Sequence, residues 1–212
     1  MPTDAAIGQL SSLLQGLRLP ASVLSPLLAH AEAVEIEADR LGLVSKGDAS
    51  NVLTRHTTDS LGFALARRPR PDARWVDVGS GAGFPGLPLA ICFASTRFTL
   101  IEPQQRRAGF LDLQVSNLGL ENVTVLAMRA EDVAARFQVG TARALAHPEA
   151  ALARVGALLE PGGEAIVAVG SQESWQGKAF GEGARLVEVP GFGVDSPGRL
   201  LMMTRPSGGA TE

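Results

Sequence analysis

Apolar residues follow two different patterns along this chain of 212 residues. In the first third, leucines such as Leu10, Leu13 and Leu17 recur three and four positions apart, the spacing that places side chains on one face of a helix. Pro20 interrupts this pattern, because proline lacks the amide hydrogen that the interior of a helix requires. The pattern therefore predicts three helices, one before Pro20, one over residues 21–41 and one over residues 50–66, with a loop at residues 42–49.

From Arg74 onward, short apolar runs alternate with helical ones, a pattern typical of strands joined by crossover helices in a mostly parallel sheet. The predicted strands are residues 74–78, 97–101, 123–127, 139–142, 164–169, 184–189 and 200–205. The predicted helices are residues 87–93, 105–118, 131–135 and 148–158. Prolines and glycines, and no clear helix, separate the last two strands, so these two should pair antiparallel.

The two patterns together predict an α/β, Rossmann-like fold. We expect a mostly parallel seven-stranded sheet with an antiparallel C-terminal strand pair and an N-terminal helical extension. The extension should cover residues 1–70 and the sheet domain residues 71–206, and the polar residues 207–212 should form a flexible tail.

Composition says more about the setting of the protein than about its chemistry. Hydrophobic residues make up 45% and charged residues 19% of the chain, as in ordinary soluble globular proteins. The net charge of −3 argues against a surface covered with nucleic-acid contacts, but it leaves room for a local basic patch. Only Lys46 and Lys178 of the 19 basic residues are lysines. This bias is compatible with phosphate contacts by arginine, and arginine-favouring codon usage also explains it.

Several absences indicate where the protein works. The single cysteine, Cys92, excludes an intramolecular disulfide and suits a reducing compartment. No apolar run approaches the roughly 20 residues that span a bilayer, and residues 1–19 lack the pattern of a signal peptide. We therefore expect a cytoplasmic protein without a membrane partner.

A glycine-rich turn follows the first predicted strand and is the most informative segment. Gly79, Gly81 and Gly83 alternate after Val78, which lets the backbone turn tightly at the carboxyl end of a strand, where open parallel sheets bind ligands. A dinucleotide fingerprint would need glycine at the position of Phe84, so a nicotinamide oxidoreductase is disfavoured.

Acidic residues complete this pattern. Alternate glycines after Asp77 resemble the cofactor motif of class I methyltransferases, which implies S-adenosyl-L-methionine as ligand and a role for Asp77 in organising the loop and the ligand's ammonium group. Glu102 ends the second predicted strand, where a carboxylate can accept both ribose hydroxyls, unless it is simply a surface residue. Ala130, Glu131 and Asp132 follow the third strand, where they would contact the adenine or cap the next helix.

The absence of catalytic motifs known from other methyltransferases narrows the range of substrates. Cys92 lies in an apolar helix, which disfavours the cysteine nucleophile of pyrimidine methylation. The Asn/Asp-Pro-Pro-aromatic motif of amino-group methylation is absent, because residues 141–144 read Thr-Ala-Arg-Ala. N7 of guanine remains a suitable target, since its lone pair is free and catalysis then rests on orientation. Many small-molecule methyltransferases would pass the same test.

Several segments resemble the ribosomal RNA small-subunit methyltransferase G family. They are residues 76–90, 118–123, 141–144, 55–56, 59–61 and 161–163. The resemblance implies methyl transfer from S-adenosyl-L-methionine to N7 of a guanine in 16S ribosomal RNA. It also implies that Arg143 faces the methyl-transfer pocket as the catalytic residue. The residues that it implies for the cofactor site are Gly79, Phe84, Ala130, Glu131 and Arg143.

Two segments depart from the family pattern. Residues 38–45 stand where the family usually carries an aromatic residue, Asn-Lys and Asn-Leu-Thr, and residues 168–170 lack the usual lysine. Both leave the cofactor residues intact but bear on the substrate surface. The alternatives are therefore a class I methyltransferase acting on a small molecule or a different RNA, or a non-catalytic module that binds the cofactor.

Basic residues concentrate in the last part of the predicted helical extension and at its junction with the sheet domain. Residues 40–74 hold seven basic residues against three acidic ones, and with Arg106 and Arg107 they could form a rim that contacts phosphates, or merely a solvated linker. We expect Arg55, His56 and Arg106 to bind substrate, although His56 suits a structural role and Arg143 a structural ion pair. The partner would be 16S ribosomal RNA or the small-subunit particle, bound by a monomer. The histidines and acids show no metal-ligand spacing.

Overall fold

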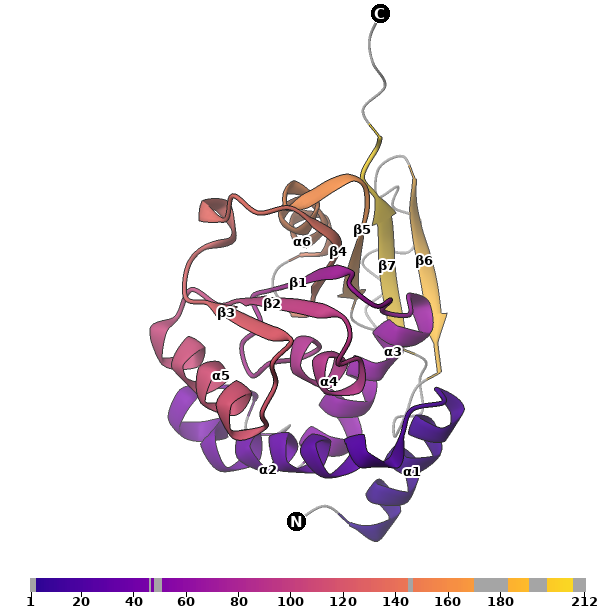
Figure 1. The fold of residues 1–212 in the computed structure, drawn as a ribbon, viewed down its shortest axis with the longest axis vertical. Coiled ribbons are helices and arrows are strands. Elements are labelled where there is room, and N and C mark those ends of the chain that lie inside the picture. The colour runs from indigo at the N-terminus through magenta and orange to yellow at the C-terminus, as the bar shows by residue number, and fades with distance from the viewer. Residues whose placement is uncertain are drawn as a thin grey trace, which may run out of the picture.

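The computed structural model describes residues 3–45, 47, 51–144, 147–169, 183–190 and 198–207, and it shows a sheet covered by helices on both faces (Figure 1). The helical elements are α1 (Asp4–Gly16), η1 (Ala21–Val23), α2 (Leu24–Leu41), η3 (Val52–Thr57), α3 (Thr58–Ala66), α4 (Gly86–Cys92), α5 (Gln105–Asn117), η4 (Ala130–Asp132) and α6 (Pro148–Ala157). The strands are β1 (Arg74–Val78), β2 (Arg97–Ile101), β3 (Val123–Leu126), β4 (Phe137–Ala142), β5 (Leu159–Val169), β6 (Ala184–Val189) and β7 (Gly198–Thr204).

The sheet confirms the predicted fold class. Its seven strands run in the order β3-β2-β1-β4-β5-β7-β6. The first five strands pair in parallel, whereas β7 pairs antiparallel with both β5 and β6. Strand order reverses between β1 and β4, so the chain leaves these two strands in opposite directions and opens a crevice at their carboxyl ends.

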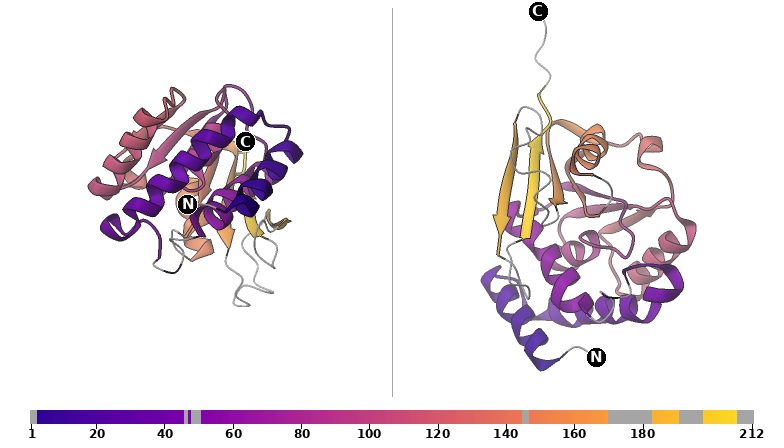
Figure 2. Two further views of the ribbon diagram at one scale, coloured as in Figure 1. Left: turned by 90° about the horizontal axis from the view of Figure 1, so that it is seen from below. Right: turned by 180° about the vertical axis from the view of Figure 1, so that it is seen from behind.

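Alternate side chains of the strands enter two cores, one on each face of the sheet. Trp75 of β1 joins the core beneath α4 and α5, whereas Val76 joins the core beneath α6. The N-terminal helices belong to the first of these cores, since Leu10 and Leu27 are fully buried in it. Figure 2 shows α2 crossing in front of the sheet in the view from below. The extension therefore packs with α4 and α5, the helices that cover this face of the sheet, instead of standing apart from the domain.

The helical segment predicted over residues 50–66 contains an irregularity that the sequence does not signal. Its first part, η3, is a π-helix, and it passes directly into α3. The wider turns of π-helices are rare in proteins, and those that occur are often found at functional sites. The preceding helix α2 ends because Gly42 adopts a left-handed conformation with φ of 60°.

Two sequence predictions are wrong. The helix expected over residues 131–135 is only the short turn η4. Val133 takes an extended conformation and is the one buried residue between η4 and β4, so these residues have no apolar face that would hold a helix against the sheet. Strand β5 begins at Leu159 and not at Glu164. Leu159 pairs with Phe137, and the register then shifts before Glu164 pairs with Val139, with Gly162 at a φ of 79° in the stretch between. Predictions for Lys46, Asp48, residues 191–197 and the tail from residue 208 lie outside the described residues.

Candidate active site

The glycine turn lies between β1 and α4 and needs its glycines. Gly79, Gly81 and Gly83 have φ of 70°, 55° and 97°, a region that side chains disfavour. At Gly83 a Cβ atom would also come within 2.6 Å of the Leu87 side chain. Both the Gly79 and Ser80 amides donate to the carbonyl oxygen of Ile101, at 2.8 and 3.1 Å. The turn is thereby fixed to the end of β2.

Asp77 organises this turn from below. Its buried Oδ1 accepts a hydrogen bond from Thr141 Oγ1 at 2.9 Å, and Oδ2 accepts one from the Gly86 amide at 3.3 Å. Burial raises the pKa of Asp77 to about 6, although the hydrogen bonds and the charge of Arg143 act in the opposite direction. The carboxylate therefore joins β4 to the start of α4, in line with its predicted role in the loop.

Glu102 joins the turn to the loop after β2. It is 3% exposed, and it accepts hydrogen bonds from the Gly81 amide at 2.9 Å and from the Gln104 amide at 2.8 Å. The reading of Glu102 as a simple surface residue is therefore wrong. Each carboxylate oxygen keeps a second lone pair, so the group can still accept hydroxyl donors.

A first cleft of about 650 Å³ runs beside this loop. Its walls include Gly79, Gln104, Ala130 and Glu131, and the Glu131 carboxylate pairs with Arg154 at 3.1 Å. The alternative that Glu131 and Asp132 cap the next helix is wrong. Both residues lie within η4, whose N-cap is Arg129, and the next element after η4 is the strand β4.

A second cleft of about 520 Å³ adjoins the other side of the turn. Its lining residues are Gly42–Ser45, His56, Gly79–Ala82, Phe84, Arg107, Arg143 and Ala144. Arg107 donates to the carbonyl oxygen of Gly42 at 2.6 Å and to that of Leu41 at 3.4 Å. It thus holds the segment after α2 as a wall of the cleft, whereas Arg106 lies exposed on α5 outside the lining of these clefts.

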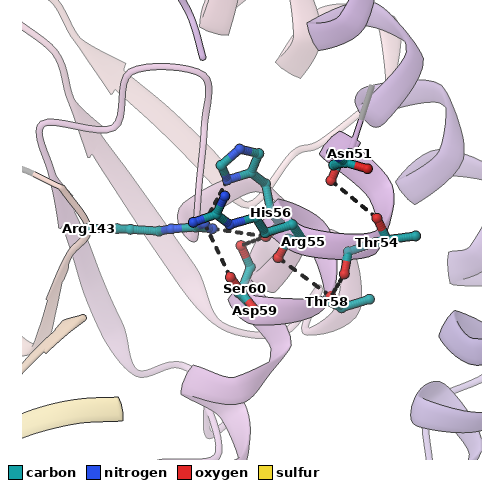
Figure 3. Close-up of polar contacts among 8 residues, drawn as sticks. All are labelled: Asn51, Thr54, Arg55, His56, Thr58, Asp59, Ser60 and Arg143. Atoms are coloured by element: carbon teal, nitrogen blue, oxygen red, sulfur yellow. Dashed lines mark hydrogen bonds and ion pairs between the residues drawn. The ribbon is translucent and has the colours of Figure 1, made fainter. Parts of the chain in front are cut away.

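Arg143 leaves the end of β4 and meets residues of η3 and α3 (Figure 3). Its Nη1 donates to the His56 carbonyl oxygen at 3.2 Å, and its Nη2 lies 2.6 Å from His56 Nδ1 and 3.3 Å from Asp59 Oδ2. Because a guanidinium group has no acceptor, Nδ1 must accept and His56 is neutral. The His56 ring also stacks on Phe84, with centroids 5.5 Å apart. Arg143 therefore makes the ion pair considered above and still lines the cleft.

Asp59 is a member of this cluster that the sequence reasoning did not include. Its side chain is 30% exposed, and burial raises the pKa of Asp59 while the charges of Arg143 and Arg55 lower it. Asp59 follows Arg55 and His56 by four and three positions, the spacing of neighbours on one helix face, which could have identified it.

A third cleft, of about 450 Å³, opens between this cluster and the C-terminal strands. Its lining residues are Arg55, His56, Asp59, Gly62, Phe63, Arg143, Ala144, Pro148, Ala168, Val169, Val189, Pro190, Gly198, Arg199 and Leu200. His56, Arg143 and Ala144 line the second and third clefts alike. The cluster therefore stands where the glycine turn meets a separate, partly apolar chamber.

The described part of the chain offers neither a metal site nor a membrane helix. No group of three or more His, Cys, Asp or Glu residues is placed to hold a metal ion there. Within the same residues, no helix is both long enough and apolar enough to cross a bilayer.

Comparison with solved structures supports the fold. A SAM-dependent O-methyltransferase from Thermotoga maritima superposes with a TM-score of 0.53 over 70% of this chain and 65% of that protein, at 16% identity. Such low identity is informative about the fold alone. The Rossmann-like methyltransferase architecture predicted from the sequence is thus confirmed.

Comparison with sequences identifies the family. The profile described as rRNA small subunit methyltransferase G matches residues 24–184. Proteins named ribosomal RNA small subunit methyltransferase G are 41% identical over 64% of this chain in Acidothermus cellulolyticus and 36% identical over 88% of it in Frankia alni, covering 60% and 78% of those proteins. Against the relatives from Acidothermus cellulolyticus, Cellvibrio japonicus and Roseiflexus castenholzii, this chain spans 60%, 64% and 58% of their lengths. This chain belongs to the rRNA small subunit methyltransferase G family.

Proposed function

We propose that this protein transfers the methyl group of S-adenosyl-L-methionine to N7 of a guanine in 16S ribosomal RNA. The observation that carries the proposal is the junction at His56, Arg143 and Ala144, where a glycine-lined cleft meets a chamber suited to a base. Family membership supports the same reaction, because the relatives are named as ribosomal RNA methyltransferases.

The cofactor residues have the chemistry that this ligand needs. Gly81 lines the second cleft, and a Cβ atom there would meet only a backbone oxygen at 3.8 Å, so the turn leaves space for a ligand. We assign the amino-acid part of the cofactor to Asp77, Gly79, Gly81, Gly83 and Phe84. We assign the ribose to Glu102, and the adenine to Ala130 and Glu131.

The reaction requires orientation and no base. The cofactor supplies an electrophilic methyl carbon on a sulfonium sulfur, which N7 attacks with its in-plane lone pair as the carbon–sulfur bond breaks. Arg143 would fix the base at the junction. Asp59 offsets the positive charge of Arg143, which lies beside the five-membered ring of the guanine, and this ring becomes cationic when N7 is methylated. Arg55, His56 and Arg106 would contact the substrate.

Loss of one modified nucleotide tests this function. A strain without the gene should lack one 7-methylguanosine in its 16S RNA, and the wild-type gene should restore it, whereas the Arg143→Ala variant should not. Mass mapping of digested 16S RNA measures this directly. Unchanged methylation in the deletion strain would contradict the assignment.

One observation favours a second candidate, a methyltransferase with a different substrate. The segment that departs from the family pattern supplies Gly42–Ser45 to the wall of the second cleft. Transfer to small molecules or other RNA, with none to the small-subunit particle, would support this candidate. Binding of the cofactor without transfer to any substrate would instead indicate a non-catalytic module.

A further inference from the structure

The third cleft combines apolar walls with an uneven set of charges. Phe63, Val169 and Leu200 supply apolar surface, which suits the faces of a flat ring. Among its described lining residues, three arginines face a single carboxylate, that of Asp59. Arg199 pairs with Glu188 at 3.1 Å, outside the lining. Asp59 is therefore the one anionic acceptor among the lining residues that the structure describes.

The Asp59 carboxylate is only partly used by the protein. Its Oδ2 contacts Arg143 at a long 3.3 Å, and its Oδ1 makes no hydrogen bond within the described part of the chain. The side chain is 30% exposed and lines the third cleft, so a ligand in that cleft can contact it. A carboxylate accepts hydrogen bonds and cannot donate them, whereas the neighbouring guanidinium groups only donate.

This acceptor beside donors matches one edge of guanine. Guanine presents N1–H and the N2 amino group as adjacent donors, followed by O6 as an acceptor. Adenine presents an unprotonated N1 there, whose lone pair would face the carboxylate and repel it. Enzymes that act on a base extracted from its stack commonly read this edge through hydrogen bonds.

The arrangement of the clefts fits the same orientation. Asp59 lines the third cleft and not the second, whereas His56 and Arg143 line both. N7 lies on a different edge of guanine from N1 and N2, with O6 between them. A base held on Asp59 by N1 and N2 can therefore turn O6 toward Arg143 and N7 toward the glycine turn.

We propose that Asp59 is the residue that selects guanine, by accepting hydrogen bonds from N1–H and the N2 amino group of the target base. The proposal rests on the proposed function and adds a specificity residue to it. Asp59 would touch the substrate on the edge away from the reacting atom.

Inosine distinguishes a role of Asp59 in binding the base from a role in supporting Arg143. It keeps N7, O6 and N1–H of guanosine and lacks only the N2 amino group. Small-subunit particles are assembled on 16S RNA transcribed with a small share of inosine triphosphate, so guanine and inosine compete at the same position. Mass spectrometry gives 7-methylguanosine relative to 7-methylinosine, corrected for the inosine content at that position. The wild type should favour guanine about tenfold or more, the effect of one hydrogen bond to a charged group.

The Asp59→Asn variant places an amide donor against guanine's donors. Its preference should fall to about twofold or less, with total transfer reduced and cofactor affinity within about threefold of the wild type. If Asp59 only supports Arg143, guanine and inosine lose rate equally and the ratio stays unchanged. Asp72→Asn is the matched control, since that carboxylate is at the other end of the sheet and its side chain is 84% exposed.

The outcomes distinguish the two proposals. Methylated guanine with equal guanine-to-inosine ratios in the wild type and Asp59→Asn overturns the role of Asp59 alone. A wild type without any preference does the same, even if the variant does not fold. No 7-methylated purine from the wild type overturns the proposed function, and the role of Asp59 with it.

Discussion

The two ends of the sheet hold arginines in different settings. At the amino end, Arg67 pairs with Glu164 at 2.5 Å and Arg74 with Glu160 at 2.9 Å, beside the first residues of β1 and β5. At the carboxyl end, Arg143 meets His56 and Asp59 and also lines two clefts. The ion pairs at the amino end border a depression of their own, whereas the cluster at the carboxyl end lines the cleft beside the glycine turn and the chamber that adjoins it.

The contrast revises the basic rim expected from residues 40–74. Arg55 lines the third cleft at the carboxyl end, but Arg67, Arg68 and Arg70 line a separate depression at the amino end. Arg68 donates to the Leu17 carbonyl oxygen at 2.9 Å and lies over the Phe93 ring. These residues do not form one continuous rim, so proximity in the sequence overstated their common role.

The largest expected difference between the two ends concerns Arg143. Arg143→Ala removes the donor at the junction and leaves Asp59 without its partner, so methyl transfer should fall about 100-fold or more. Arg74→Ala removes an exposed ion pair worth at most about 1 kcal/mol and should leave transfer unchanged. Single-turnover rates on small-subunit particles measure both. Equal effects of the two variants would contradict the contrast.

Burial of the Asp77 carboxyl group should make the stability of the protein depend on pH. Burial raises the pKa of this group from 3.8 to about 6, so between these values the folded state binds more protons than the unfolded chain. Its contribution to the free energy of unfolding therefore falls as pH rises through this window, by about 3 kcal/mol, and is constant above it. Asp77→Asn should remove this slope.

Urea unfolding at intervals from acid to neutral pH measures the effect. The difference in stability between Asp77→Asn and the wild type should shift in favour of the variant as pH rises through the window. Asp72→Asn serves as the control, because it makes the same chemical change at a carboxylate that is 84% exposed at the amino end of the sheet. A constant difference for Asp77→Asn would show that its carboxylate does not titrate in this way.

Glu102 at the carboxyl end and Glu160 at the amino end should differ in their effect on cofactor binding. Glu102→Ala leaves the Gly81 and Gln104 amides without their acceptor and loosens the turn, so the Kd for S-adenosyl-L-methionine should rise about tenfold or more. Glu160→Ala removes only the pair with Arg74 and should leave that Kd within about twofold. Calorimetric titration with the cofactor tests both variants, and an unchanged Kd for Glu102→Ala would exclude Glu102 from the site.

The sequence predicted what depends on short segments. The glycine turn and the strand before it follow from local backbone needs, and the parallel order follows from alternating strands and helices. Contacts between distant residues were not predictable in this way. Arg143 and Asp59 are 84 positions apart, and Arg107 and Gly42 are 65 apart. The direction of each side chain around α5 places Arg107 and not Arg106 in the lining of the second cleft, because neighbouring helix positions point about 100° apart.

The smallest expected difference concerns Arg107. Arg107→Ala removes two hydrogen bonds that hold the carboxyl end of α2 against the second cleft, so kcat/KM should fall about fivefold. Arg107→Lys keeps a cation near the helix end and should recover part of this loss. Arg97→Ala, which breaks an exposed pair with Asp72 at the amino end, is the control and should change nothing. If Arg107→Ala left kcat/KM unchanged, the segment Gly42–Ser45 would not shape the cleft, and its departure from the family pattern would have no bearing on substrate choice.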